Sequence, residues 1–223
     1  MTLPLTSSTR VLVDASVLRR RAAAVAGGML ADLRGDAYGH GALEAARIVS
    51  AAGVPEVLVD PDQVDRLRGA GIRARRDGVP DVDASALYGI PSAPAMTLRG
   101  QVMSTKRLLP GDAVSYGYTY RAERESTVAL VTGGYAQGIV RALSNRALVE
   151  VGGVLCPIVG RVAMDVCVVD VSAVDPVVGD EVVYFGGTGP ARDQLENWVR
   201  VSGLTAGELV TIVGLKGDRE WTE

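Results

Sequence analysis

The chain has 223 residues, of which 48% are hydrophobic and only 4% aromatic, so it can bury a sizeable core built mainly from aliphatic side chains. Its formal net charge is −3 and its basic residues are scattered, which argues against a nucleic-acid surface. No apolar run reaches the roughly 18 residues that a membrane span needs, and the N-terminus lacks the charged-then-apolar pattern of a signal peptide. We therefore expect a cytoplasmic protein that contacts neither nucleic acid nor membrane.

Metal-ligating residue types are scarce. The chain holds one histidine and two cysteines, too few for a structural zinc site. Cys156 and Cys167 both fall in apolar, strand-like segments, so we expect buried, reduced thiols.

The first 76 residues alternate strands with helices. Asp14 and Asp60 are suited to cap the helices that follow them, and Pro61 is typical of a first helical turn. This alternation predicts βαβ units and a parallel sheet. The expected strands are 10–14, 29–33 and 56–60, and the expected helices are 15–26, 41–52 and 61–69. Residues 77–95 are rich in Gly and Pro, which predicts a connecting segment.

The pattern changes at Met96, where short β-rich runs begin to recur between Gly and Pro turns. The sequence therefore predicts an α/β segment over 1–95 and a mostly antiparallel, all-β domain over 96–223. The expected strands are 96–108, 127–132, 148–151, 155–164, 166–171 and 181–185. One amphipathic helix is expected over 191–202, and a helix or strand over 204–213.

Four stretches, in order along the chain, resemble the alanine racemases, a family of pyridoxal-phosphate enzymes. They are Leu33-Arg34-Gly35-Asp36-Ala37-Tyr38-Gly39-His40-Gly41, Val114 to Tyr120, Gly134 to Gly138 with Arg141 to Arg146, and Pro157 to Asp165. A single match of this kind would be weak evidence of kinship. Four at compatible spacings identify the chain as similar to that family.

The resemblance implies a (β/α)8 barrel that holds pyridoxal phosphate, a C-terminal β domain and a head-to-tail homodimer that interconverts L- and D-alanine. It assigns the general base to Tyr116, which would reach the active site of the other subunit. It assigns cofactor contacts to Tyr38 and His40, and contacts to the substrate carboxylate to Met164 and Asp165.

Position 34 departs from the family. Racemisation needs a lysine that holds the cofactor as a Schiff base, and this position is Arg34. A guanidinium stays protonated, so it is neither the nucleophile nor a general base. The only lysines, Lys106 and Lys216, lie in other segments. The resemblance also suggests that Val82 replaces an arginine facing the pyridine nitrogen, and that Gly207 replaces a tyrosine at the phosphate.

The segment before Met96 is short for a barrel. A (β/α)8 barrel takes about 250 residues, and 95 residues leave room for two or three βα units. We expect a barrel remnant that either packs as a small α/β layer on the β domain or pairs with another chain.

The sequence is compatible with three functions. The chain is by ancestry an alanine racemase, and its own residues predict little or no activity, as in a pseudoenzyme. The alternatives are a non-catalytic module that self-associates or binds a partner, and an enzyme with residual pyridoxal-phosphate chemistry. Arg141 and Arg161 could bind an anion or could be exposed strand arginines.

Overall fold

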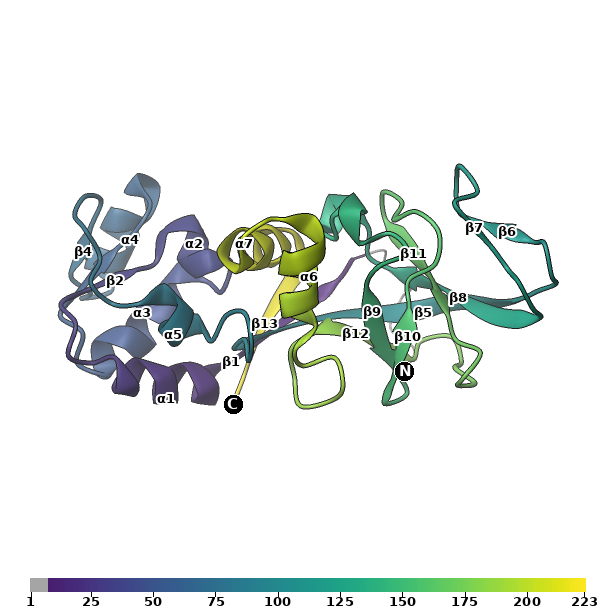
Figure 1. Ribbon diagram of the computed structural model, residues 1–223. Helices are drawn as coiled ribbons and strands as arrows, with labels where there is room; N and C mark the ends of the chain where they lie inside the picture. Colours follow the sequence, from purple (N-terminus) through teal and green to yellow (C-terminus); the bar gives the residue numbers. More distant parts are fainter. Residues whose placement is uncertain (1–7) are drawn as a thin grey trace.

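One long strand, β5 (Met96–Leu108), organises the larger sheet of the protein, whose computed structural model describes residues 8–223. It pairs antiparallel with β1 (Arg10–Asp14), β12 (Glu181–Phe185) and β8 (Ser126–Thr132). Because β5 is 13 residues long, different parts of it bind different neighbours, and the sheet extends along the molecule (Figure 1). The N-terminal segment in which a signal-peptide pattern was sought lies partly in residues 1–7, outside the described residues.

The remaining strands extend this sheet at its edges. β11 (Val166–Asp170) pairs antiparallel with β8, β9 (Leu148–Val151) pairs with β12, and β10 (Val154–Pro157) pairs with β9. β13 (Asp218–Thr222) joins β1 in the one parallel pairing within this sheet of the described chain. The predicted antiparallel β domain is confirmed.

A second, three-stranded parallel sheet lies at the other end of the molecule (Figure 1). Its strands are β2 (Leu30–Asp32), β3 (Glu56–Leu58) and β4 (Ala74–Arg75). The helices of this end are α1 (Ala15–Ala24), α3 (Ala42–Ala51), the 3-10 turn η1 (Pro61–Gln63) with α4 (Val64–Gly69), and α5 (Ala84–Tyr88). The predicted alternation of strand and helix thus produces a parallel sheet.

The free edge of β2 is covered by the chain itself. The Asp81 carboxylate accepts hydrogen bonds from the backbone N–H groups of Met29 and Leu30, at 2.9 and 2.8 Å. The Leu30 carbonyl accepts in return from the backbone of Asp81 and Val82. An unpaired sheet edge is a site where another chain can pair. At the start of β2, these bonds occupy the backbone groups of Leu30 that face away from β3.

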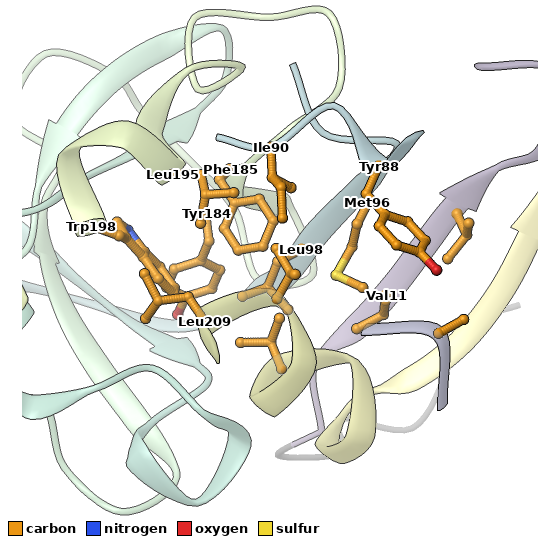
Figure 2. Packing of buried hydrophobic residues seen from close by; sticks show 14 of the residues in the cluster. Val11, Tyr88, Ile90, Met96, Leu98, Tyr184, Phe185, Leu195, Trp198 and Leu209 are labelled. Atoms are coloured by element: carbon orange, nitrogen blue, oxygen red, sulfur yellow. The ribbon is translucent and has the colours of Figure 1, made fainter. Parts of the chain in front are cut away.

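One hydrophobic core joins the two sheets. Figure 2 shows the part of this core that lies around β5 and β12. Val11 of β1 and Met96 and Leu98 of β5 supply its centre. Tyr184 and Phe185 of β12 pack edge-on against Trp198. Their ring centroids lie 6.3 and 5.2 Å, respectively, from that of Trp198. Trp198 lies on α6 (Gln194–Ser202), which packs with α7 (Ala206–Lys216) over the middle of the molecule (Figure 1). The largest buried aromatic side chains are Trp198, Tyr88, Tyr184 and Phe185.

Several local expectations were wrong. Strand β1 was expected among the parallel strands, but it joins the antiparallel sheet through β5. Residues 77–95 hold a helix, α5, whose N-cap Asp83 accepts from Ser85 N. The strand expected over 155–164 ends at Pro157 because the chain then turns at Gly160, where φ is +76°.

Helix caps and the C-terminal end differ from expectation in part. Asp14 caps α1 as predicted, at 2.8 Å from Val17 N. Asp60 does not cap its own helix, because its carboxylate accepts from Gly35 N instead. The segment after Leu204 is a helix, and the final strand β13 was not foreseen.

No single helix in residues 8–223 has the length and apolar composition to cross a membrane. The pair α6 and α7 reaches that length only when both are counted across a bend of 109°.

Candidate functional site

A left-handed helical turn follows β2 and carries the first motif. Residues Gly35, Asp36, Ala37 and Tyr38 have φ between +53° and +63°, although the segment is drawn as α2 (Arg34–Tyr38) in Figure 1. The turn has helix-like hydrogen bonds, from Ala37 N to Leu33 O and from Gly39 N to Gly35 O, both 2.8 Å. A left-handed conformation costs about 1–2 kcal/mol for each residue with a Cβ. Other contacts must therefore hold Asp36, Ala37 and Tyr38 in place.

Two carboxylates and one arginine hold the turn. Asp60, at the end of the neighbouring strand segment, accepts from the backbone N–H groups of Gly35 at 2.8 Å and Asp36 at 3.3 Å. Asp36 accepts from Ala42 N at the start of α3. Arg219 of β13 donates to Asp36 Oδ2 at 2.7 Å and to the Gly39 carbonyl at 2.9 Å. The C-terminal strand thus fixes a turn that lies 183 residues earlier in the chain.

Arg34 lies at the start of this turn and is paired with Asp32. Its Nε and Nη2 donate to the two carboxylate oxygens at 2.9 and 2.6 Å, a fork-to-fork geometry that favours arginine over lysine. The Asp32 side chain is almost fully buried, whereas that of Arg34 is 53% exposed. Burial alone would raise the pKa of Asp32, but the hydrogen bonds and charge from Arg34 outweigh it, so this pKa lies below its usual value.

A cavity of about 550 Å³ opens beside Arg34, between the left-handed turn and the start of α7. Tyr38 closes one wall, and its ring lies against Gly207, where an added Cβ would come within 2.9 Å of the Tyr38 Cε1. Gly207 therefore leaves room for Tyr38 rather than adding a side chain of its own. The lining residues are Asp32, Arg34, Gly35, Tyr38, Leu204, Thr205, Gly207, Glu208, Thr211 and Ile212.

His40 is fully buried behind this cavity and does not line it. Its Nδ1 lies 2.9 Å from the Ala37 carbonyl and 3.0 Å from the Tyr38 carbonyl, so Nδ1 carries the proton and donates. The imidazole stacks on Tyr88 with centroids 4.6 Å apart. Burial lowers the His40 pKa to about 4 despite the two carbonyls. His40 is therefore a neutral side chain that supports the turn from inside.

The other predicted site residues, Tyr116, Met164 and Asp165, do not line the cavity. Tyr116 follows β6 (Ala113–Val114), at the opposite end of the molecule from α2 (Figure 1). Its hydroxyl donates to the Val162 carbonyl at 3.3 Å. Met164 is 55% exposed, and Asp165 accepts from Gln137 at 3.2 Å. The chain therefore divides its predicted site residues into two groups that do not meet within one molecule.

Sequence reasoning missed Asp32, Asp60 and Arg219. Asp32 could have been noticed, because it is the one acidic residue inside an otherwise apolar strand, two positions before Arg34. Arg219 had no such signal, since its partner is distant in the sequence. Neither Lys106 on β5 nor Lys216 at the end of α7 lines the cavity. In residues 8–223 no group of three His, Cys, Asp or Glu side chains could hold a metal ion.

Comparison with known proteins connects these features to a family. Residues 95–221, more than half of the chain, match the family model for the alanine racemase C-terminal domain. The chain belongs to the alanine racemase family. This confirms the resemblance inferred from the four motifs.

Relatives in this family cover different shares of the chain. The alanine racemase of Salinispora arenicola is 44% identical over 122 residues, 54% of this chain and 32% of that protein. That of Mycolicibacterium vanbaalenii is 35% identical over 166 residues, 74% of this chain and 42% of that protein. The chain thus spans less than half the length of the curated relatives it matches.

The fold also matches a solved structure. The alanine racemase from D-cycloserine-producing Streptomyces lavendulae superposes with a TM-score of 0.82 over 98% of both chains, at 21% sequence identity. At that identity the likeness establishes the fold and leaves the chemistry to the residues themselves.

Proposed function

We propose that this chain is an alanine racemase homologue whose own cofactor pocket does not support catalysis. The single observation that carries this proposal is the Arg34–Asp32 pair at the position of the family's Schiff-base lysine. A guanidinium held by two hydrogen bonds to a buried carboxylate has no free electron pair with which to attack an aldehyde. The side chains present therefore do not fit a lysine-linked pyridoxal phosphate.

Two neighbouring features support the same proposal. Gly207 contributes no hydroxyl at the start of α7, and Tyr38 fills the adjacent space. Val82, where the family resemblance suggests an arginine, is buried against Gly28 rather than directed at a ligand. The parallel sheet over β2–β4 is, in this proposal, the remnant of the barrel. The boundary near residue 95 is part of the same proposal. Tyr38 and His40 occupy the positions of the family's cofactor contacts, and Met164 and Asp165 those of its substrate contacts, without a cofactor attached in this chain.

Cofactor attachment tests it directly. The purified protein is incubated with pyridoxal phosphate and reduced with borohydride, and any labelled lysine is mapped by mass spectrometry. We expect no stoichiometric label on Lys106 or Lys216 and no racemisation of alanine. A specific label accompanied by turnover that survives repurification would contradict the proposal and favour the residual-enzyme alternative.

The double variant Arg34→Lys/Asp32→Val tests whether an amine at position 34 can hold the cofactor. Asp32 is changed as well because its carboxylate would hold a new lysine in the charged form, which is not nucleophilic. We expect a cofactor label at residue 34 in this double variant only. Arg73→Lys, an exposed position on the same small layer, is the matched control for nonspecific labelling.

A second candidate function is a non-catalytic module that pairs with another copy or with a full-length racemase. Tyr116, Tyr135 and Met164 are each at least 42% exposed on the β-sheet end, a composition typical of protein interfaces. In the family's head-to-tail dimer, such a surface would face a second subunit.

Light scattering measures this pairing. We expect a dimer mass for the chain alone or for an equimolar mixture with a full-length alanine racemase, and a shift toward monomer in Tyr116→Ala/Met164→Ala. A monomer mass at all concentrations, with no complex in the mixture, would refute this function. It would leave the proposal for the cofactor pocket untouched.

A further inference from the structure

A pocket of about 750 Å³ opens beside the hairpin at the β-sheet end of the molecule (Figure 1). In this hairpin β7 (Tyr120–Arg121) pairs antiparallel with β6, and the chain then leads into β8. The pocket shares no lining residue with the cavity at Arg34, so the two are separate. Its lining residues include Tyr120, Arg121, Glu123, Arg124, Ser126 and Asp170.

Charges of both signs line this pocket without neutralising one another. Two arginines and two acidic residues contribute to the lining, and in residues 8–223 none of these four side chains forms a salt bridge. The adjacent Glu125, which does not line the pocket, does pair with Arg107. Ion pairs therefore form close by where the spacing allows, and the four charges of the pocket remain available to a ligand.

Hydrogen bonds fix one charged side chain of each sign. Arg121 Nη1 donates to the Gly111 carbonyl at 2.9 Å, and its guanidinium carbon lies 5.9 Å from the centroid of the Tyr118 ring. Asp170 Oδ1 accepts from the Ser172 hydroxyl at 2.6 Å and from the Ser172 N–H at 3.0 Å. Because these bonds form within the chain, both side chains are oriented before a ligand arrives, which reduces the ordering cost of binding.

Tyr120 connects the pocket to the interior of the β domain. Burial raises the pKa of Tyr120, and the charges of Asp170 and Glu123 act in the same direction, so its hydroxyl stays protonated. The partly buried Tyr120 packs against a small hydrophobic cluster formed by Leu108, Val114, Ala122, Val128 and Val159.

A buried hydroxyl in the pocket wall lacks a partner. Ser126 begins β8, lines the pocket and is only 5% exposed. In residues 8–223 its Oγ forms no hydrogen bond. A buried hydroxyl without a partner is costly in free energy, and a hydrogen bond to a ligand removes that cost. The pocket therefore favours a ligand that brings a polar atom to Ser126.

We propose that this pocket binds a small zwitterion, in the class of free amino acids and short peptides. The carboxylates of Asp170 and Glu123 attract its ammonium group, and the guanidinium groups of Arg121 and Arg124 bind its carboxylate. Ser126 bonds to a polar atom of the same ligand. Because the four charges sum to zero, the pocket favours neither a simple anion nor a simple cation. The site does not depend on the proposed loss of catalysis.

Isothermal titration calorimetry in low-salt buffer tests the site with two zwitterions, glycine and glycylglycine. We expect saturable one-to-one binding of at least one of them, and the tighter of the two assigns the amino acid or the peptide class. The N-acetyl derivative of that zwitterion lacks the ammonium group, and its amide derivative lacks the carboxylate. Each derivative should bind at least about fivefold more weakly, since each loses its charged hydrogen bonds.

Two variants remove one charge each from the pocket. In residues 8–223 the side chains of Glu123 and Arg124 are exposed and form no hydrogen bond, so Glu123→Gln and Arg124→Gln should leave the fold intact, which circular dichroism checks. We expect each to weaken binding by about threefold to tenfold. The matched controls Asp175→Asn and Arg20→Gln, at exposed positions outside the pocket, should change binding by less than about twofold.

Ser126→Ala distinguishes a contact with the ligand from a structural role. The hydroxyl has no partner within the described chain, so its removal should not lower the melting temperature, whereas binding should weaken by about threefold or more. Absence of saturable binding of both zwitterions by the parent chain would overturn the proposal. Equally tight binding of the blocked derivatives, or equal losses in Glu123→Gln and Asp175→Asn, would overturn it as well.

Discussion

The protein has one histidine, and its protonation should control stability in a pH range where few other groups titrate. His40 is fully buried, and its pKa is lowered to about 4 by loss of solvation. In the unfolded chain its pKa returns to about 6.5. Between these values the unfolded state binds the proton and the folded state does not. Stability therefore falls as the pH falls below about 6.5, and the loss levels off near the folded pKa.

The size of the effect follows from the two pKa values. Each pKa unit corresponds to about 1.36 kcal/mol, so the linkage predicts a loss of about 2 kcal/mol between about pH 7 and pH 4.5. The lowered pKa values of Asp14, Asp32 and Asp81 act mainly below this interval, because the ordinary pKa of these carboxyl groups is already 3.8. The interval therefore reports chiefly on His40.

Urea unfolding at a series of pH values measures this dependence, with His40→Gln as the reference. The variant loses the ionisable ring, so its free energy of unfolding should lack most of the slope between about pH 4.5 and 6.5, whatever its absolute stability. NMR of the single imidazole should show no titration in the folded protein above about pH 5. Equal slopes in both proteins, or an imidazole that titrates near its unfolded pKa while the chain is folded, would refute the assignment of His40 as a buried neutral group.

Three further predictions concern the left-handed turn and the thiols. Gly39→Ala should destabilise the fold by more than about 3 kcal/mol, because φ is +76° and the new Cβ would lie 2.8 Å from Gly214 Cα and from Val210 O. Gly53→Ala, also at positive φ but in open space, should cost about 1–2 kcal/mol. Thermal melts that show the same loss of stability in both variants would contradict this account. Asp60→Ala should cost about 1–3 kcal/mol by leaving two backbone donors unpaired, whereas Asp62→Ala, on the exposed face of η1, should change the urea midpoint little. Burial raises the Cys167 pKa to about 12 and that of Cys156 in the same direction, so neither thiol should react with a disulfide reagent at about pH 8 until the chain is unfolded, and rapid labelling of the native protein would show that the core packing is wrong.

Much of the β domain was predictable from the sequence. The limits of β5, β9 and β12 match the expected ranges, because alternating apolar residues bounded by Gly and Pro determine a strand locally. Membership of the family could also be predicted from the sequence, since four short motifs keep their order and spacing. The replacement of the family's lysine by Arg34 was evident from that single position.

Other features depended on partners far away in the chain. The pairing of β1 with β5 and β13, rather than with the parallel strands, has no signal in residues 10–14 because an isolated apolar strand suits either sheet. Asp60 has the sequence of a helix cap, yet its carboxylate serves a turn 25 residues earlier.

For the candidate sites too, some features followed from the sequence and others only from the tertiary structure. By itself the sequence determined which side chains are available: a guanidinium where an amine was expected, one histidine, and a tyrosine and methionine in known motifs. Only the tertiary structure decided their environment. It buried His40, paired Arg34 with Asp32, separated Tyr116 from the cavity, and brought Arg141 and Arg161 to one ring. The physical reason is that charge, burial and spacing at a site are set by contacts between segments that fold together, whereas a sequence pattern reports only on neighbours within a few residues.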